Sequence, residues 1–336
     1  MSDSLDSEEN STYLEHSQIK TVLIGLMLGL FLAALDQTIV ATAIRTIGDD
    51  LQGLSIQAWA TTAYLITSTI TTPIYGKLGD IFGRKILFNW AISIFVIGSL
   101  LSAFANSMYQ LAGFRAIQGL GAGGLFVLAL AIIGDIVPPR ERSRYQAYFI
   151  AVFGSASVLG PVIGGFLAGQ ENILGLAGWR WVFFVNVPIG IFALIVVSRT
   201  LKILKFIKTP QRIDWWGATF ITVGLVPLLL LAEQGSSWGW SSFNSLLALT
   251  IGVGGLVIFV IVEIKMKDAA IIPMRLFRDK TFSFISVVAA LTGIAMFGGL
   301  VTVPLYLQIV KGSTPTEAGL QLLPLTLGIA IGSVVA

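Results

Sequence analysis

The amino-acid sequence predicts an all-α polytopic membrane protein with about ten transmembrane helices. Of its 336 residues, 55% are hydrophobic and 12% are charged, and the mean hydropathy is +0.85. An average soluble domain carries about 25% charged residues, so a soluble fold is disfavoured. A membrane-spanning helix needs about 20 mostly apolar residues and satisfies its own backbone hydrogen bonds. Long uncharged runs recur at residues 21–35, 56–76, 86–114, 116–134, 145–170, 181–198, 215–232, 235–262, 281–310 and 318–336.

The polar stretches between these runs divide the chain into expected parts. Residues 1–19 are polar and acidic and lack the features of a cleaved signal peptide, so we expect a disordered cytoplasmic tail. Residues 20–198 are expected to form a six-helix bundle. A cytoplasmic linker follows at residues 199–212, either as an amphipathic helix on the inner leaflet or as a solvated loop. The remaining expected parts are two additional transmembrane helices (213–263), a second cytoplasmic loop (264–280) and two further helices (281–336).

The distribution of positive charge predicts the orientation in the membrane. Most of the 21 lysines and arginines fall in the tail and in the loops after the second, fourth, sixth and eighth helices. The opposite side keeps only Arg45, Arg180 and Lys311. Cytoplasmic loops carry the excess of Lys and Arg, so both termini are expected in the cytoplasm of a cell whose cytoplasmic membrane holds the protein. The pI of about 9.1 then reflects topology, and nucleic-acid binding is not expected because no basic domain stands apart from the membrane.

Several kinds of chemistry are disfavoured by residues that the sequence lacks. It has no cysteine, and its one histidine, His16, falls in the polar tail. We therefore expect no metal site, no cofactor and no enzymatic nucleophile–base pair. Residues 119–124 formally match G-x-G-x-x-G, but no strand precedes them, so a close helix–helix contact through Gly119 and Gly123 is expected instead of a dinucleotide site.

Two charges interrupt apolar helices and are the first candidate site. Asp36 falls in the first helix and Arg115 in the fourth, and each is expected roughly 10–12 Å below the outer surface at 1.5 Å rise per residue. A charge in the bilayer centre costs about 2.5–3.5 kcal/mol on insertion scales, so it usually faces a partner or a cavity. The pair favours a proton switch, with a static structural ion pair or a snorkelling arginine as the alternatives.

A glycine-rich charged turn at residues 76–85 is the second candidate site. Gly76 and Gly83, with a glycine between them, permit a sharp turn. Asp80 is expected to cap the next helix or pair with Arg84. Arg84 and Lys85 are expected at the lipid headgroups. The simpler alternative is a turn that only obeys the positive-inside rule.

Two further patterns concern helix packing and the membrane interface. The fifth helix carries Gly160, Pro161, Gly164 and Gly165, which predict tight packing and a bend at the proline. The aromatic residues between Trp179 and Phe184 are expected to form an interfacial belt at the outer end of the sixth helix.

These motifs together resemble the major facilitator superfamily of secondary transporters. Residues 76–85 resemble its loop between helices 2 and 3, and Arg115 with Gln118 and Gly119 resembles its helix-4 motif. Gly154, Gly160, Pro161, Gly164 and Gly165 resemble its antiporter motif. Residues 35–38 and 178–190 look like those of its 14-helix drug:proton antiporter branch.

The resemblance implies a fold, a function and residue roles. It implies a proton-coupled exporter of hydrophobic or cationic small molecules that works by alternating access. Asp36 would carry the proton with help from Arg115, and Asp80, Arg84 and Lys85 would belong to an inner gate. Residues 281–336 would be the first two helices of an incomplete C-terminal bundle. The open alternatives are a truncated, non-transporting fragment, a subunit whose partner supplies the missing helices, or a transporter of one specific metabolite.

Overall fold

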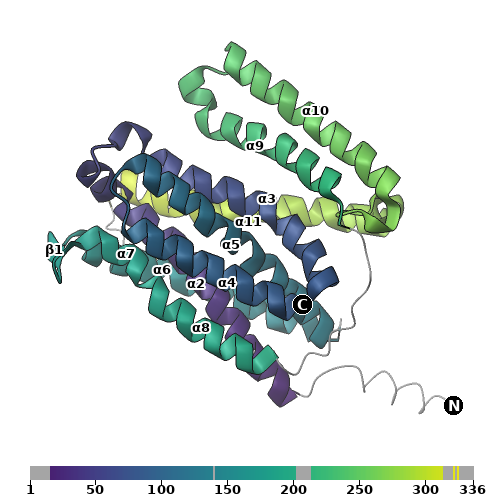
Figure 1. The fold of residues 1–336 in the computed structure, drawn as a ribbon, viewed down its shortest axis with the longest axis horizontal. Helices are drawn as coiled ribbons and strands as arrows, with labels where there is room; N and C mark the ends of the chain where they lie inside the picture. Colours follow the sequence, from purple (N-terminus) through teal and green to yellow (C-terminus); the bar gives the residue numbers. More distant parts are fainter. Residues whose placement is uncertain (1–15, 139–140, 202–212, 313–320, 322–323, 325–336) are drawn as a thin grey trace.

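The computed structural model describes residues 16–138, 141–201 and 213–312, with residues 321 and 324. The described part of the chain is built almost entirely from helices, which Figure 1 shows as a bundle of long, roughly aligned rods. The helices are α2 (His16–Asp50), α3 (Ala58–Phe82), α4 (Arg84–Ala103), α5 (Met108–Ile136), α6 (Arg142–Ala168), α7 (Trp181–Phe184), α8 (Asn186–Thr200), α9 (Trp215–Trp238), α10 (Phe243–Met266) and α11 (Lys280–Ile309).

Seven of the ten predicted membrane-spanning segments correspond to helices that, in the described part of the chain, are long and apolar enough to cross a membrane, and the predicted segments at residues 56–76 and 281–310, in α3 and α11, are not among them. Within the described residues, seven helical segments are long and apolar enough to cross a membrane. They lie in α2, α4, α5, α6, the stretch from Gly178 to Thr200, α9 and α10. Helix α3 has 25 residues but carries many hydroxyl side chains, and the apolar part of α11 spans Lys280–Ala295. The tenth expected run, residues 318–336, lies outside the described residues except for positions 321 and 324. Residues 1–15 and 202–212, in the expected tail and linker, also lie outside the described residues.

Close helix contacts organise the bundle formed by α2–α8. Helix α5 packs against both α3 and α4, while α2 packs against α6 and α8. Glycines make the closest of these contacts, since a Cβ atom at Gly119 or Gly123 would collide with the backbone of α3, and one at Gly121 with that of α4. These small residues thus let the helix backbones approach closely. Such packing matters because burial of apolar surface alone does not drive helices together in lipid. The sequence prediction of a close contact through Gly119 and Gly123 is confirmed.

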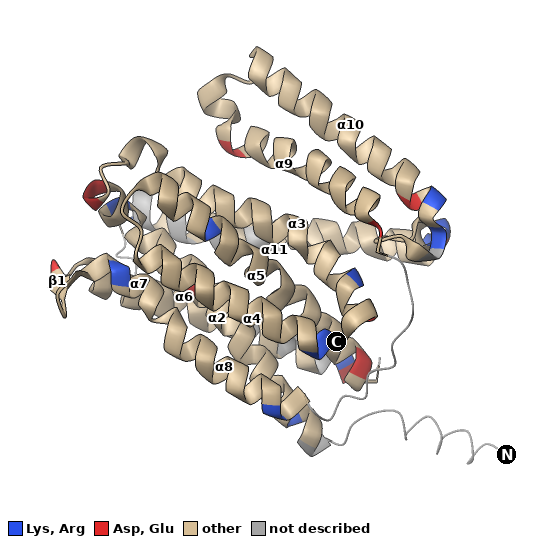
Figure 2. Cartoon of the chain, in the orientation of Figure 1, with Lys and Arg blue, Asp and Glu red and all other residues tan. Residues whose placement is uncertain are grey.

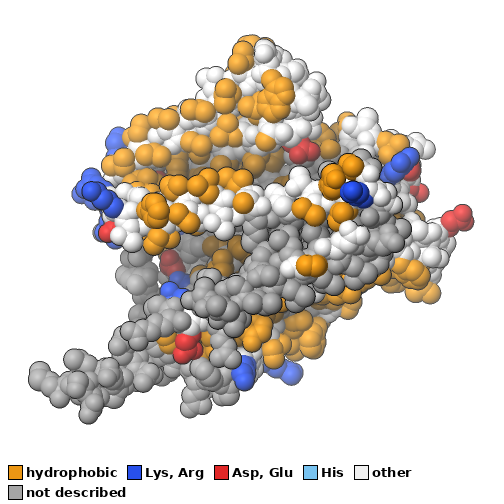
Figure 3. Space-filling model, turned by 180° about the vertical axis from the view of Figure 1, so that it is seen from behind, with side chains coloured by type: hydrophobic (Ala, Val, Ile, Leu, Met, Phe, Trp, Pro, Cys, Tyr) orange, Lys and Arg blue, Asp and Glu red, His pale blue; other side chains and the backbone are white. Residues whose placement is uncertain are grey.

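Helices α9 and α10 form an antiparallel pair beside this bundle (Figure 1). Gly224 of α9 faces Gly252 and Gly255 of α10, and a Cβ atom at Gly255 would lie 2.7 Å from the backbone nitrogen of Gly224. The pair contacts the bundle through α9 and α3. Seen from behind, apolar side chains cover the sides of the helices (Figure 3), as expected of surfaces that meet lipid.

Charged side chains lie mainly at the helix ends. Figure 2 shows lysines and arginines at the end of the bundle where α3, α8 and α10 terminate, with fewer at the opposite end. The sequence-based assignment of sides therefore corresponds to two spatially distinct ends of the molecule.

The aromatic stretch before α8 differs from the sequence-based expectation. Trp179 is 2% exposed and Phe183 is fully buried, so these two rings do not belong to a lipid-facing belt. Trp179 donates a hydrogen bond from Nε1 to Asp50 Oδ2 at 2.7 Å, and its ring meets Phe183 edge to face. A short hairpin, β1 (Asn172–Ile173) and β2 (Leu176–Ala177), precedes this stretch. The two rings are buried in an apolar cluster that also contains Ile47 of α2 and Ala103 of α4.

Candidate functional site

Asp36 and Arg115 form a buried ion pair in the core of the bundle. Asp36 lies in α2 and Arg115 in α5, and their side chains are 0% and 1% exposed. Arg115 NH1 lies 2.6 Å from Asp36 Oδ2. A buried pair of this kind offsets its desolvation cost only when hydrogen bonds also satisfy the remaining polar atoms.

Two amides complete the coordination of the Asp36 carboxylate. Gln118 Nε2 donates to Asp36 Oδ1 at 2.9 Å, and Asn186 Nδ2 donates to the same oxygen at 2.7 Å. Gln118 also accepts a hydrogen bond from Arg115 NH1 at 2.7 Å. Asn186 lies within 3.0 Å of Ser99 Oγ, which itself donates to the carbonyl of Phe183. Helices α2, α5 and α8 thus meet at one carboxylate, and α4 joins them through the bond from Asn186 to Ser99.

Sequence reasoning did not identify Asn186 or Ser99 as site residues. Both are fully buried, and Asn186 is one amide in an otherwise apolar run. That isolated polar residue in a spanning helix was the available signal, because buried polar groups in lipid require partners. Ser99 offered no comparable signal, since a serine can bond within its own helix.

The guanidinium of Arg115 connects this centre to α3. Its Nε donates to the carbonyl of Ala60 at 3.3 Å, and its central carbon lies 4.1 Å from the centroid of the Tyr64 ring. A cation over an aromatic face gains about 0.5–2 kcal/mol depending on its desolvation. Arg115 therefore contacts both Asp36 and Tyr64, so a change in the charge of Asp36 would alter the interaction between Arg115 and the Tyr64 ring.

An open cavity of about 300 Å³ lies beside the ionic centre. It is bordered by α2, α3, α5 and α6, and Tyr64 belongs both to its wall and to the surroundings of Arg115. Gln37, next in sequence to Asp36, also lines it. Aromatic and hydroxyl side chains such as Phe126, Phe153 and Ser68 make the rest of the wall both apolar and hydrogen-bonding.

The charged turn between α3 and α4 is held by arginine contacts. Gly83 has φ 97°, a conformation that L side chains rarely adopt, so the turn requires glycine there. Arg84 lies 3.0 Å from Asp80 Oδ1 and 2.8 Å from Asp135 Oδ2, and it also donates to the carbonyl of Ala131. Asp80 pairs with Arg84 and does not cap α4, whose N-cap residue Gly83 has no side-chain hydrogen bond.

Other members of this turn contribute less to its geometry. A Cβ atom at Gly76 would meet only Val127 at 3.7 Å, which is an ordinary contact. A Cβ atom at Gly79 would lie 2.7 Å from the Cδ2 atom of Leu128, so the Leu128 side chain packs closely on α3 there. Lys85 follows Arg84 in α4 and is half-buried. Sequence reasoning missed Asp135. This acidic residue lies at the end of α5, just before a basic loop, and is separated from Arg84 by 51 positions.

The glycines of α6 bring that helix against α2, close to the ionic centre. A Cβ atom at Gly160 would collide with Thr38, and one at Gly164 would lie 2.8 Å from the carbonyl of Ile39. Thr38, two residues after Asp36, donates a hydrogen bond to the carbonyl of Ala156 at 2.9 Å.

The remaining residues of the predicted antiporter motif also lie in α6. Gly165 has room, since its Cβ atom would meet Thr42 at 3.9 Å, and Gly154 is buried. Helix α6 continues through Pro161 from Arg142 to Ala168. Gly160 of this motif thus lies against α2 at Thr38, two residues from the predicted proton site at Asp36.

The two candidate sites are separate along α5. Arg115 lies near the start of this helix and Asp135 at its end, which corresponds to about 30 Å at 1.5 Å rise per residue. Among the described residues, no group of three or more His, Cys, Asp and Glu side chains could hold a metal ion.

The chain matches known transporters over nearly its whole length. The family model described as Major Facilitator Superfamily matches residues 26–336. The chain is 39% identical over 318 residues to the Multidrug transporter protein MdtP of Bacillus subtilis, a match that covers 94% of this chain and 57% of that protein. It is 38% identical over 327 residues to Multidrug resistance protein 3 of B. subtilis, covering 97% and 62%. It is 37% identical over 323 residues to the Efflux pump dotC of Dothistroma septosporum, covering 94% and 54%.

The chain therefore spans less than two thirds of the length of these curated relatives. Solved structures agree with the fold. The proton:xylose symporter XylE matches with a TM-score of 0.60 at 16% identity, over 96% of this chain and 69% of that chain. A bacterial homologue of the human lysosomal transporter Spinster matches with a TM-score of 0.51 at 16% identity, over 94% and 80%. With a family model over residues 26–336, bundled spanning helices and this fold, the chain belongs to the Major Facilitator Superfamily.

Proposed function

We propose that this chain takes part in proton-coupled export of hydrophobic or cationic small molecules by alternating access. The observation that carries the proposal is the buried carboxylate of Asp36 in α2, on which an arginine and an amide from α5 and a second amide from α8 converge. The names of the relatives, a multidrug transporter, a multidrug resistance protein and an efflux pump, support the substrate class.

Protonation of Asp36 would change the forces between helices. The unprotonated carboxylate pairs with Arg115 and accepts from Gln118 and Asn186. A proton on the carboxyl group removes the charge that holds Arg115, so α2 and α5 lose their strongest mutual interaction. The guanidinium keeps its contacts to Ala60 and Tyr64, and these would hold it on the α3 side.

The cavity beside this centre is the proposed place for substrate on this half of the transporter. Its wall shares Tyr64 with the environment of Arg115, and Gln37 adjoins Asp36 in the chain. A cationic substrate would be favoured when Asp36 is unprotonated and disfavoured when Arg115 is released from its pair. Substrate and proton would then compete through the same charge, which is what exchange in opposite directions requires.

The turn at residues 76–85 is proposed as a gate at the cytoplasmic end. Arg84 links Asp80 of α3 to Asp135 of α5, so the ends of three helices are tied by one guanidinium. The positive-inside distribution supports the proposal that this end, and both termini, face the cytoplasm of a cell whose cytoplasmic membrane holds the chain. A proton moving inward through 100 mV supplies about 2.3 kcal/mol, and each pH unit adds about 1.4 kcal/mol.

The test is efflux of a cationic dye together with proton release in inverted vesicles. The protein would be compared with Asp36→Asn and with the matched control Asp49→Asn, an exposed carboxylate near the end of the same helix. Dye transport coupled to protons should be lost in Asp36→Asn and retained in Asp49→Asn. Full coupled transport by Asp36→Asn would contradict the assignment of the proton to this residue.

The remaining outcomes separate the alternatives. A silent chain that is correctly inserted, and that becomes active when a second polypeptide supplies further helices, would favour a subunit with a partner. Silence under both conditions would contradict transport by this chain. Proton-coupled uptake or release of one polar metabolite, without dye transport, would replace the drug substrate class.

A further inference from the structure

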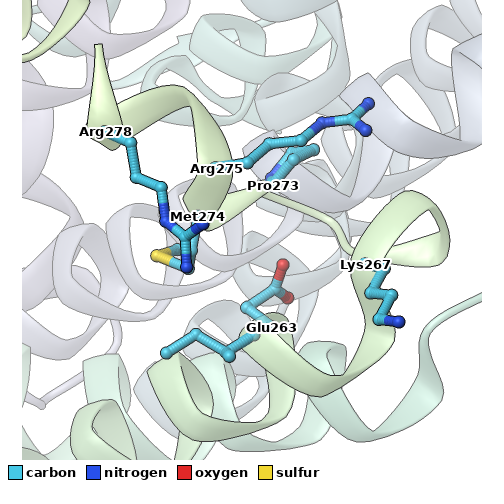
Figure 4. Close-up of a pocket in the computed structure, with 7 residues that line it drawn as sticks. Glu263, Lys267, Pro273, Met274, Arg275 and Arg278 are labelled. Carbon is cyan, nitrogen blue, oxygen red and sulfur yellow. The ribbon is translucent and has the colours of Figure 1, made fainter.

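A second open pocket lies at the end of α10, far in sequence from the ionic centre. Its volume is about 420 Å³, and Figure 4 shows it between the end of α10 and the following loop. It is lined by Glu263, Ile264, Lys267, Pro273, Met274, Arg275 and Arg278. Three cationic side chains and a single carboxylate therefore surround one space, and the mechanism proposed above uses none of them.

Hydrogen bonds within the protein hold the loop that forms the pocket. Glu263 is 1% exposed, and its Oε2 accepts from the backbone nitrogen of Ile272 at 2.7 Å. At the far side, Asp279 caps α11 by accepting from the nitrogen of Phe282 at 2.8 Å. The carboxylate of Glu263 thus shapes the loop that borders the pocket.

The backbone at Lys267 is strained. Its φ of 50° and ψ of −109° are unusual for a residue with a side chain, and they turn the chain sharply at the end of α10. Strain of this kind persists where the surroundings impose it, often at ligand sites. Figure 4 shows the Arg278 guanidinium beside Met274, and the charged ends of Lys267 and Arg275 on the other side of Glu263, directed away from its carboxylate.

The surroundings of the pocket are apolar and exposed. Ile264 is 57% exposed, Ile261 is 46% exposed and Phe277 is 46% exposed. Figure 3 shows basic side chains gathered at the left-hand end of helices whose sides are covered by apolar groups. A basic pocket at the end of a lipid-facing helix lies at the depth of the headgroups.

We propose that this pocket binds the phosphate of an anionic phospholipid, with Lys267, Arg275 and Arg278 as the ligands. Lysine and arginine donate charge-assisted hydrogen bonds to phosphate, and arginine does so with two parallel donors. A lipid, in preference to free phosphate, fits the apolar surface next to the cations, because that surface receives the acyl chains. Bound lipid would tie α10 to the loop before α11, at the join between the α9–α10 pair and the next helix.

The test is a lipid titration of the whole chain in detergent, read by native mass spectrometry. Phosphatidylglycerol would be compared with phosphatidylcholine for the protein, for Lys267→Gln/Arg278→Gln and for the single variant Arg278→Gln. The matched control is Lys265→Gln/Lys280→Gln, which removes two charges at the same end of the molecule from residues that do not line the pocket. Competition with soluble glycerol phosphate and inorganic phosphate separates a lipid from a free anion.

We expect phosphatidylglycerol to bind better than phosphatidylcholine, and the pocket double variant to weaken its binding about tenfold or more. The control double variant should weaken it less than about twofold. Equal losses in the two double variants would mean general attraction to a basic surface and would overturn the proposal. So would displacement of the lipid by millimolar phosphate, which would identify a free anion as the occupant. If the pocket double variant does not fold, Arg278→Gln alone provides the test. This single variant should still weaken phosphatidylglycerol binding more than the control double variant does.

Discussion

Replacing Asp36 and Arg115 separately and together would measure how strongly the buried pair couples α2 to α5. The variants are Asp36→Asn, Arg115→Gln and the double substitution. Asparagine keeps one oxygen to accept from Gln118 or Asn186, so the hydrogen bonds are partly preserved while the charge is removed. Asp36→Asn then leaves the guanidinium, which is 1% exposed, without a counter-charge.

The expected magnitudes follow from that burial. Removing one partner of a buried ion pair costs about 3–5 kcal/mol because the other charge stays buried and uncompensated. Either single substitution should lower the free energy of unfolding by an amount in this range. The double substitution removes both charges, so its cost should fall below the sum of the single costs by up to about 3 kcal/mol.

The assay is denaturant-induced unfolding in mixed micelles, analysed as a double-mutant cycle. A control cycle with Asp80→Asn and Arg84→Gln tests a pair at 3.0 Å whose side chains are 51% and 23% exposed. Solvent-exposed pairs couple by roughly 0.2–1 kcal/mol. Additivity at Asp36 and Arg115 within about 0.5 kcal/mol would refute the claim that burial makes this pair strong. Restored stability with lost proton coupling in the double variant would separate the structural role of Asp36 from its transport role.

Two further predictions concern packing and the cytoplasmic turn. Gly119→Ala should destabilise the protein by at least the roughly 1–3 kcal/mol typical of overpacking, because the new methyl group meets the α3 backbone. The control is Gly113→Ala, where nothing lies within 4 Å of the new Cβ atom. In the same unfolding experiment this control should be neutral or stabilising by up to about 1 kcal/mol. Equal effects of the two substitutions would contradict the close α3–α5 approach. Asp135→Asn should lower the unfolding free energy by less than about 1 kcal/mol, because its pair with Arg84 is half exposed, and a loss as large as that of a fully buried charge would contradict this reasoning.

Much of the fold could be predicted from composition along the chain. Apolar runs of spanning length identify helices because lipid offers no partners for backbone amides. The apolar run at residues 86–114 overlaps α4 and the start of α5, and the runs at residues 215–232 and 235–262 overlap α9 and α10. Trp179 and Phe183 were predicted wrongly as members of an interfacial belt, because hydropathy reports the tendency of a ring to leave water and does not report which surface covers it. Trp179 finds its cover in the end of α2, 129 residues earlier in the chain.

The sequence by itself determined the membrane class, the order of helices and the presence of Asp36 and Arg115 as costly charges in apolar segments. Those conclusions depend on local composition, and local composition is sufficient because each spanning helix satisfies its own backbone. Only the tertiary structure decided that Asn186 and Ser99 join the same carboxylate, and that Asp135 pairs with the turn. The rotation of each helix about its axis, set by contacts between helices far apart in the chain, determines which polar side chains meet. No apolar run, however long, encodes that rotation.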